Sequence, residues 1–260
     1  MRLSLGSVCY AHVGFEEMMR RAVARGYRHL ELICIPGWIH VDLREITARE
    51  LARQVRDHGM ELIALYPGGV DVSDPRTARR NIDYIKRACE YAVELGLERI
   101  VFTGCARKTP LSASISAYSE LAEHLKGSRV VIALENHFRN RLETIEDYRA
   151  VFEALDSPNL GITLDTGHFT SSRVDMFALI EEFGARVKHV HLKDHVGEES
   201  VAIGRGETPN REVLLRLAEI GYNGWVSLEL EVRDPENTDL YVAEARTLIE
   251  EWIAAAKEPR

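Results

Sequence analysis

Residues 130–135 read Val-Val-Ile-Ala-Leu-Glu, a short aliphatic run that ends in a carboxylate. Three later strand-like runs also end in an ionisable residue: Leu-Gly-Ile-Thr-Leu-Asp at 160–165, Val-Lys-His-Val-His at 187–191 and Trp-Val-Ser-Leu-Glu at 225–229. Such short runs, rich in aliphatic and β-branched residues, are typical of buried strands. A helix-length segment separates each run from the next, as between the strands of a parallel sheet. The four ionisable residues then lie at equivalent ends of neighbouring strands.

Four earlier runs extend this rhythm back to the start of the chain. The predicted strands are, in order, Leu3–Cys9, His29–Ile35, Glu61–Tyr66, Arg99–Thr103, Val130–Glu135, Gly161–Asp165, Val187–His191 and Trp225–Glu229. Each is followed by a segment with helical spacing of apolar residues, the last being Asp239–Ala255. Eight βα units in 260 residues fit a (β/α)8 barrel, whose usual length is about 250 residues.

We therefore predict an α/β protein with one domain over residues 1–260, folded as a (β/α)8 TIM barrel. An open, doubly wound sheet is the alternative. Closure is favoured because the units number eight, the chain starts on a strand and ends on a helix, and the candidate site draws on four adjacent strands. His195–Pro209 is expected to be the only long connection, and a long loop at the active face of a barrel is often functional.

Composition narrows the class of protein. The four cysteines form no CxxC pair, which indicates a reducing compartment. No apolar run approaches the roughly 20 residues of a membrane span, and the N-terminus lacks the apolar core of a signal peptide. We expect a cytoplasmic protein without a membrane partner. The net charge of -8 argues against a nucleic-acid partner, although it does not exclude a local basic cleft.

The four strand-end residues predict a metal site. Because side chains alternate along a barrel strand, Glu135, Asp165, His191 and Glu229 are expected to point inward, with an aliphatic neighbour of each pointing to the helices. Four ionisable groups in one barrel mouth are costly to bury unpaired, and one divalent cation removes that cost. Three carboxylates and an imidazole suit Mn²⁺ first, with Mg²⁺, Co²⁺ or Zn²⁺ as further choices. Buried ion pairs with Lys or Arg are the alternative.

Four strings carry a resemblance to a known family. They are Leu-Glu-Asn-His (134–137), Leu-Asp-Thr-Gly-His (164–168), His-Val-His-Leu-Lys-Asp (189–194) and Gly-Tyr-Asn-Gly-Trp-Val-Ser-Leu-Glu (221–229). Together they resemble the xylose isomerase-like TIM-barrel superfamily. Its members include sugar isomerases and epimerases, inosose and dehydroshikimate dehydratases, and endonuclease IV.

The resemblance implies that Glu135, Asp165, His191 and Glu229 bind the metal and that His168 binds a substrate oxygen. It also implies that Glu135 and Glu229 act as catalytic acid and base. Geometry supports these roles, because the fifth and eighth strands end nearly opposite each other across a barrel mouth. One glutamate can remove a proton from a hydroxy-ketone while the other returns one, and the metal stabilises the enediolate. Epimerisation, isomerisation and dehydration are all open to this set.

Departures from the family pattern help to decide which branch of the superfamily this chain resembles. The nuclease branch binds three zinc ions and takes histidines from early strand ends, but the third strand here ends in Tyr66-Pro67 and the fourth is followed by Gly104-Cys105. Asp194-His195 also differs from the Asp-x-His of that branch. The epimerase branch usually has an arginine six residues after the histidine ligand, where this chain has Gly197. Arg205 is therefore a candidate to bind substrate by another route.

The remaining candidates for substrate contact each have a second interpretation. His137 either faces substrate or caps a backbone group, and Lys193 either binds an oxygen or forms a salt bridge. Tyr10, Trp38 and Tyr66 lie at or after early strand ends and could form an aromatic wall for a sugar, or simply pack in loops. In contrast, we expect His189 to be an interior histidine and Glu31 to form an interior ion pair.

We predict an isomerase or epimerase that depends on a divalent metal and acts on a ketose, aldose or keto-sugar. The first alternative is a lyase of the same fold that dehydrates an inosose or a keto-acid. An endonuclease-like hydrolase and a non-catalytic sugar-binding barrel are further alternatives. The expected partner is a small sugar or polyol-derived molecule. A homo-oligomer is implied by the resemblance alone.

Overall fold

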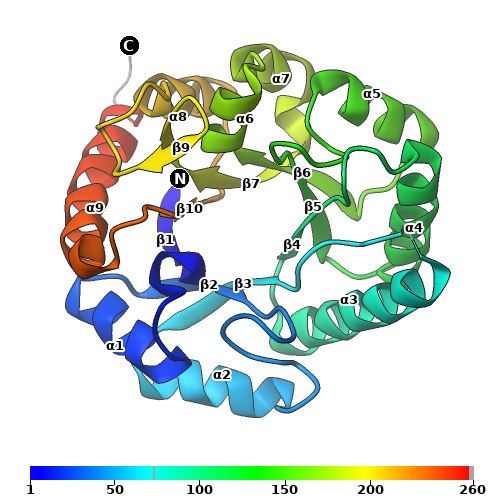
Figure 1. Ribbon diagram of the computed structural model, residues 1–260, viewed down its shortest axis with the longest axis horizontal. Helices are drawn as coiled ribbons and strands as arrows, with labels where there is room; N and C mark the ends of the chain where they lie inside the picture. The colour runs from blue at the N-terminus through cyan, green and yellow to red at the C-terminus, as the bar shows by residue number, and fades with distance from the viewer. Residues whose placement is uncertain (73, 258–260) are drawn as a thin grey trace.

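Eight parallel strands form a closed barrel in this computed structural model, which describes residues 1–72 and 74–257. Figure 1 looks along the barrel, with the helices in a ring around it. The strand order around the barrel is β1-β10-β7-β6-β5-β4-β3-β2. The strands are β1 (Arg2–Gly6), β2 (His29–Ile33), β3 (Glu61–Tyr66), β4 (Arg99–Thr103), β5 (Val131–Glu135), β6 (Leu160–Asp165), β7 (Val187–Leu192) and β10 (Trp225–Leu228). The predicted TIM barrel is confirmed.

The connections between strands are mainly helical. They contain α1 (Phe15–Ala24), α2 (Ala48–Asp57), α3 (Pro75–Leu95), α4 (Leu111–His124), α5 (Ile145–Ala154), α6 (Thr166–Ser172), α7 (Met176–Phe183) and α8 (Asn210–Glu219), and α9 (Thr238–Ala255) follows the last strand. Short 3-10 turns lie at Ser7–Tyr10, Gly184–Arg186 and Pro235–Asn237. No helix within the described part of the chain is long and apolar enough to cross a membrane.

The predicted facing of the strands is confirmed. Leu134, Leu164, Val190 and Leu228 belong to the main core, which the helices share. Ala133 instead belongs to a separate inner cluster with side chains from other strands. This alternation places the last residue of each run on the inner face of the barrel.

The first strand is shorter than predicted. It ends at Gly6, and Ser7–Tyr10 turn into a 3-10 helix instead of continuing the strand to Cys9. At this point the amide of Ile33 on β2 donates to the hydroxyl of Ser7 at 2.9 Å, so a side chain takes the place of a ladder carbonyl. The turn changes the direction of every side chain that follows it.

The loops also differ from the prediction. Part of the expected loop His195–Pro209 forms a hairpin of β8 (Asp194–Val196) and β9 (Glu199–Val201). It is not the only long connection, because residues 34–47 between β2 and α2 are irregular as well. An antiparallel bridge between Cys34 and His40 closes that second loop.

A buried carboxylate ties two loops of the barrel mouth together. Asp147, in the first turn of α5, forms a capping box with Thr144. It also accepts hydrogen bonds from Arg107 in the β4–α4 connection and, at 2.5 Å, from Arg141 in the β5–α5 connection. Burial raises the pKa of Asp147, but the Thr144, Arg107 and Arg141 donors outweigh it and hold the pKa below its ordinary value.

Replacing Asp147 with Asn should therefore destabilise the fold. We expect a loss of about 2 kcal/mol, discounted because Arg107 is partly exposed, and a fall in Tm of about 4–8 °C. Asp147 has a lowered pKa in the folded state, so its stabilisation is complete above the unfolded pKa and is lost as pH falls through the folded value. Thermal unfolding from pH 7 to pH 3 should show the difference between wild type and variant shrinking.

Asp156→Asn is the matched control for this measurement. Asp156 follows the same helix, but its side chain is 97% exposed and lies 3.4 Å from Arg186. Solvent screens such a pair, so Tm should hardly change. Equal Tm values for Asp147→Asn and wild type at pH 7 would contradict the role given to Asp147.

Candidate metal centre

Four predicted ligands converge at the carboxyl ends of their strands. Glu135 ends β5, Asp165 ends β6, His191 lies on β7 and Glu229 follows β10. One ligand atom from each lies within 4.8 Å of all the others. All four side chains are buried. The parallel strands bring all four to the carboxyl end of the barrel, where Asp165 is the register partner of His191, whereas Glu135 is level with Thr163 and His191 with Ser227.

His191 lies at the centre of the group. Its Nδ1 atom is 2.6 Å from Oε1 of Glu135 and 3.3 Å from Oε2 of Glu229. Oδ2 of Asp165 lies 3.7 Å from the same nitrogen. Burial alone would lower the pKa of His191, but Glu229, Glu31 and Glu135 hold it well above its ordinary value. The proton on His191 is therefore exchangeable for another cation among these carboxylates.

The backbone fixes Asp165 at the junction of strand and helix. Asp165 is the N-cap of α6, and its Oδ1 accepts from the amide of His168 at 2.7 Å. Asn136 joins β5 to β6: its Nδ2 donates to the Asp165 carbonyl at 2.9 Å, and its Oδ1 accepts from the Asp165 amide at 2.8 Å. The bond from His168 occupies Oδ1 of Asp165, so Oδ2 remains for the centre of the ligand group.

The donor set fits a divalent cation. Oε1 of Glu229 is buried and has no hydrogen-bond partner among residues 1–72 and 74–257, and Oδ2 of Asp165 has only ion-pair contacts, with Lys193 at 3.2 Å and His191 at 3.7 Å. Unpartnered buried carboxylate oxygens are costly, and a cation satisfies them. Burial also raises the pKa of Glu229 to about 7, against the opposing effect of His191 and Lys193. Three carboxylates and one imidazole are ligands that Mn²⁺, Mg²⁺ and Zn²⁺ accept.

Lys193 reaches the edge of this group. Its ammonium is 3.2 Å from Oδ2 of Asp165, 3.0 Å from Oε2 of Glu229 and 2.9 Å from Oε2 of Glu231. Burial lowers the pKa of Lys193, but these three carboxylates hold it well above its ordinary value, so the group is a cation. The salt-bridge interpretation is confirmed. Sequence reasoning missed Glu231, although it lies two residues beyond Glu229.

Tyr66 supports Glu135 from the opposite side. The phenol donates to Oε2 of Glu135 at 2.7 Å, and the ring lies 6.0 Å from the ring of His191. Burial and the charge of Glu135 raise the pKa of Tyr66 well above its ordinary value, so it remains a donor. The structure therefore places Tyr66 in the site, beside a ligand.

Three histidines, His137, His168 and His195, lie next to one another. The rings of His137 and His168 are 3.7 Å apart, and Nδ1 of His137 contacts the carbonyl of Phe138 at 2.9 Å. Burial lowers the pKa of His168 well below its ordinary value, so its Nε2 can accept from Lys193 at 3.3 Å. His168 and His195 open into a cavity of about 610 Å³, which Glu231 and other side chains also line.

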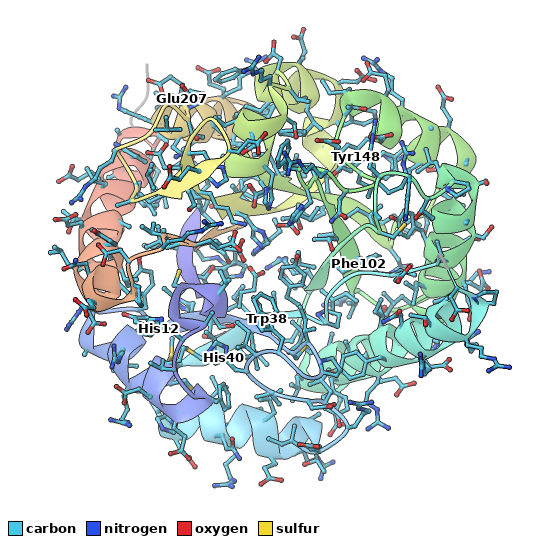
Figure 2. The ribbon with its side chains drawn as sticks, in the orientation of Figure 1. His12, Trp38, His40, Phe102, Tyr148 and Glu207 are labelled. Carbon is cyan, nitrogen blue, oxygen red and sulfur yellow. The ribbon has the colours of Figure 1, made fainter. Side chains whose placement is uncertain are left out.

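Trp38 lies on another side of the mouth, with its side chain 55% exposed. It lines a cavity of about 250 Å³ together with His12 and Glu231. Glu231 borders this cavity and the larger one, so the two are neighbours. Figure 2 shows Trp38 and His12 on the side of the mouth formed by the loops after β1 and β2.

The structure places two predicted substrate contacts, Tyr10 and Arg205, away from the ligand group. Tyr10 is fully buried in the main core, and its hydroxyl donates to Asp239 of α9 at 2.8 Å, because the 3-10 turn directs it out of the barrel. Arg205 pairs with Glu244 of α9 at 2.7 Å and covers the ring of Tyr241. Asp194 holds the Arg205 loop on the outer rim by accepting from the amides on either side, those of Gly204 and Gly206.

Comparison with known families matches this architecture. Residues 19–252 match the family described as xylose isomerase-like TIM barrel. The chain therefore belongs to that family, as its sequence motifs indicate.

Curated relatives share parts of the chain or nearly all of it. An uncharacterised protein of Methanocaldococcus jannaschii is 26% identical, over 98% of this chain and 92% of its own length. An inosose dehydratase of Serratia proteamaculans is 30% identical, over 52% of each chain. A ketose 3-epimerase of Arthrobacter globiformis is 28% identical, over 62% of this chain and 58% of its own. The match thus spans little more than half of these two enzymes.

Solved structures share the whole barrel. The IolI protein, solved with a bound zinc atom, superposes with a TM-score of 0.82 at 19% identity and covers 100% of both chains. A xylose isomerase-like TIM-barrel protein of Mycobacterium smegmatis, solved in complex with magnesium, gives a TM-score of 0.79 at 15% identity. That match covers 94% of this chain and 89% of the other. At these identities the likeness establishes the fold.

If the four strand-end residues form a metal site, the protein should bind one divalent ion per chain. Asp165→Asn should weaken binding on the order of 100-fold or more, because even the loss of a residue that only supports a ligand costs 10- to 100-fold. Titration calorimetry with Mn²⁺, Mg²⁺ and Zn²⁺ measures the affinity, and elemental analysis measures the stoichiometry. Affinity should fall as pH falls, because the ion must displace the proton of His191.

Glu198→Gln is the control for this titration. Glu198 borders the larger cavity but pairs with Arg139 at 2.9 Å, outside the ligand group. Its replacement should leave the affinity unchanged. An Asp165→Asn protein that binds metal as tightly as wild type would argue against the site.

Proposed function

We propose that the protein is a metal-dependent sugar isomerase or epimerase. The observation that carries this proposal is the approach of two glutamates, from β5 and from the end of β10, to the same point beside His191. Two strands, β6 and β7, separate them in the barrel, so they reach that point from different sides. A substrate carbon between them can lose a proton to one carboxylate and regain it from the other.

Glu135 and Glu229 have different neighbouring side chains. Tyr66 donates to one oxygen of Glu135, which orients that carboxylate. Lys193 lies beside Glu229 and presents a cation to the same region. His168 is neutral and reaches the larger cavity, where it can hydrogen-bond a hydroxyl or carbonyl of the substrate.

The ligand set Glu135, Asp165, His191 and Glu229 would hold the cation. A divalent ion bound there would supply positive charge next to the oxygens of a hydroxy-ketone, which makes the neighbouring proton easier to remove. We propose Mn²⁺ as the first choice, with Zn²⁺, Mg²⁺ and Co²⁺ as alternatives. The zinc and magnesium in the two solved relatives support a divalent ion without selecting one.

The charge of the cavity points to a neutral substrate. Glu198, Glu199 and Glu231 line it together with Arg233, and Arg139 and Lys193 pair with Glu198 and Glu231, so the wall has no excess of positive charge to bind a phosphate. Carboxylates repel a phosphate or a carboxylic acid and accept hydrogen bonds from hydroxyl groups. An unphosphorylated ketose or related polyol fits this wall, and the ketose 3-epimerase relative supports that class.

Dehydration of a keto-polyol is the second candidate. The ammonium of Lys193, 3.0 Å from Glu229, provides a donor close to where a departing hydroxyl would leave. The inosose dehydratase relatives favour the same reaction. Both reactions begin with removal of a proton beside a carbonyl. In epimerisation a proton then returns, whereas in dehydration a hydroxyl leaves.

We further propose that residues 1–260 form one domain of a cytoplasmic enzyme. Its four cysteines are buried and unpaired, as is usual for proteins of a reducing compartment.

Glu229→Gln should lower turnover about 100- to 10,000-fold at saturating metal, because an amide cannot exchange the proton. The assay incubates a panel of ketoses and inososes with Mn²⁺ in heavy water and follows them by NMR. Deuterium uptake with a new epimer or isomer identifies isomerase chemistry, whereas an enone absorbance identifies dehydration. Glu199→Gln, on the cavity wall, should keep turnover within a small factor. Full activity of Glu229→Gln would refute the acid and base roles.

Trp38→Ala tests the aromatic wall. If the exposed indole stacks on the sugar, KM should rise about threefold to tenfold, with kcat and metal affinity unchanged. Steady-state kinetics on the substrate found above measures the two constants separately. An unchanged KM would place Trp38 outside the substrate site.

A further inference from the structure

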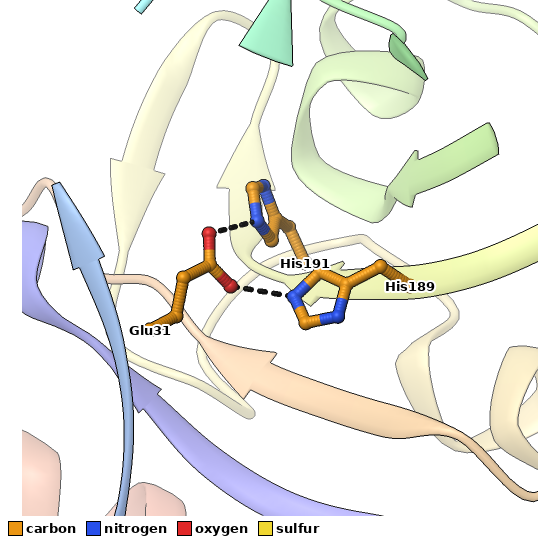
Figure 3. Close-up of side chains that lie close together, drawn as sticks. All are labelled: Glu31, His189 and His191. Atoms are coloured by element: carbon orange, nitrogen blue, oxygen red, sulfur yellow. Dashed lines mark hydrogen bonds and ion pairs between the residues drawn. The ribbon is translucent and has the colours of Figure 1, made fainter. Parts of the chain in front are cut away.

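A second cluster of ionisable groups lies inside the barrel and shares His191 with the proposed metal ligands. It consists of Glu31 on β2 with His189 and His191 on β7, and all three side chains are fully buried. Figure 3 shows the carboxylate between the two imidazoles. Two strands, β10 and β1, separate β7 from β2, so this contact crosses the barrel interior.

The contacts fix where the protons lie. Oε1 of Glu31 is 2.8 Å from Nε2 of His191, and Oε2 is 2.5 Å from Nε2 of His189. An ionised carboxylate only accepts hydrogen bonds, so both Nε2 atoms must carry hydrogen. Ser227 on β10 approaches Nε2 of His189 at 3.0 Å and also bonds Ser4 on β1 at 2.7 Å. The carboxylate is therefore held within a network that links four strands.

This arrangement determines which nitrogen of His191 faces the ligand group. When a divalent ion displaces the hydrogen from Nδ1 of the His191 cation, the hydrogen on Nε2 would stay with Glu31 and Nδ1 would offer its lone pair to the ion. That nitrogen is the one 2.6 Å from Glu135 and 3.3 Å from Glu229. A carboxylate that accepts from the other ring nitrogen of a metal-binding histidine fixes the tautomer and the orientation of the ring.

We propose that Glu31 is a positioning residue that holds His191 with its hydrogen on Nε2 and its lone pair on Nδ1 directed at the metal centre. The inference rests on the proposed metal centre. Glu31 itself touches neither substrate nor metal in this role and acts through His191.

His189 shares Glu31 but should not share this role. It lies one layer below His191 on the same face of β7, and its Nδ1 has no hydrogen-bond partner among the described residues. Its removal takes one donor from Glu31 but leaves the contact between Glu31 and His191. His189→Gln is therefore the matched control for Glu31→Gln, since both alter the buried network and only one alters the partner of the ligand.

The experiment measures metal affinity in the full-length chain by titration calorimetry with Zn²⁺ and Mn²⁺. Glu31→Gln should bind about 10- to 100-fold more weakly than wild type, the usual cost of losing such a partner. His189→Gln should stay within about threefold of wild type by the same principle. Circular dichroism and Tm establish that both variants are folded. Equal affinities for Glu31→Gln and wild type would overturn the proposal.

A second measurement does not depend on any variant folding. Nitrogen-15 NMR of the Zn²⁺-loaded wild type, labelled at histidine, should find His191 with its hydrogen on Nε2 and the metal on Nδ1. Zinc on Nε2 would overturn the proposal, and so would a second ion bound between Glu31, His189 and His191. If wild type binds no divalent ion at all, it is the metal centre that fails. Tight binding by wild type, together with an unchanged metal affinity in Glu31→Gln, would instead reject only the positioning role of Glu31.

Discussion

The constraint on which this structure depends is the burial of several carboxylates around one imidazole. Glu31, Glu135, Asp165 and Glu229 are all inside the barrel, and each has an oxygen within 3.7 Å of a ring nitrogen of His191. Burying so much negative charge is unfavourable unless cations accompany it. His191 and Lys193 supply two, and the geometry leaves Oε1 of Glu229 without a hydrogen-bond partner among the described residues, which a metal ion would satisfy. The barrel therefore gathers these buried charges where a further cation would stabilise them.

The rest of the barrel keeps these groups from relaxing apart. Parallel strands bring the ligands to the same end of the barrel, and the Asn136 side chain and the N-cap of α6 fix the backbone and one oxygen of Asp165. On the inner face, the small side chain of Ala133 packs in one cluster with Tyr66. Three of the proposed metal ligands therefore lie within strands, and Glu229 directly follows one.

The sequence was sufficient for the barrel and for the convergence of the four strand-end residues, because both follow from alternation along strands. Glu135 and Asp165 face inward by the same count that sends Leu134 and Leu164 to the helices. It was not sufficient for Tyr10, because the chain leaves the strand at Ser7 and forms a 3-10 turn. Likewise, no local pattern encodes the contact between Glu31 and His191. That contact depends on how strands β2 and β7, three places apart, face each other across the closed barrel.

The same limit applies to the reaction. The two carboxylates proposed to remove and return a proton would serve epimerisation and dehydration alike, so they cannot distinguish the two reactions. A donor for a departing hydroxyl would distinguish them, and the cation nearest to Glu229 is Lys193. Lys193 is held by Asp165, Glu229 and Glu231, and only Glu231 also borders both cavities. Under the proposed function, the choice between reprotonation and loss of a hydroxyl would depend on whether Lys193 leaves these carboxylates to contact the substrate.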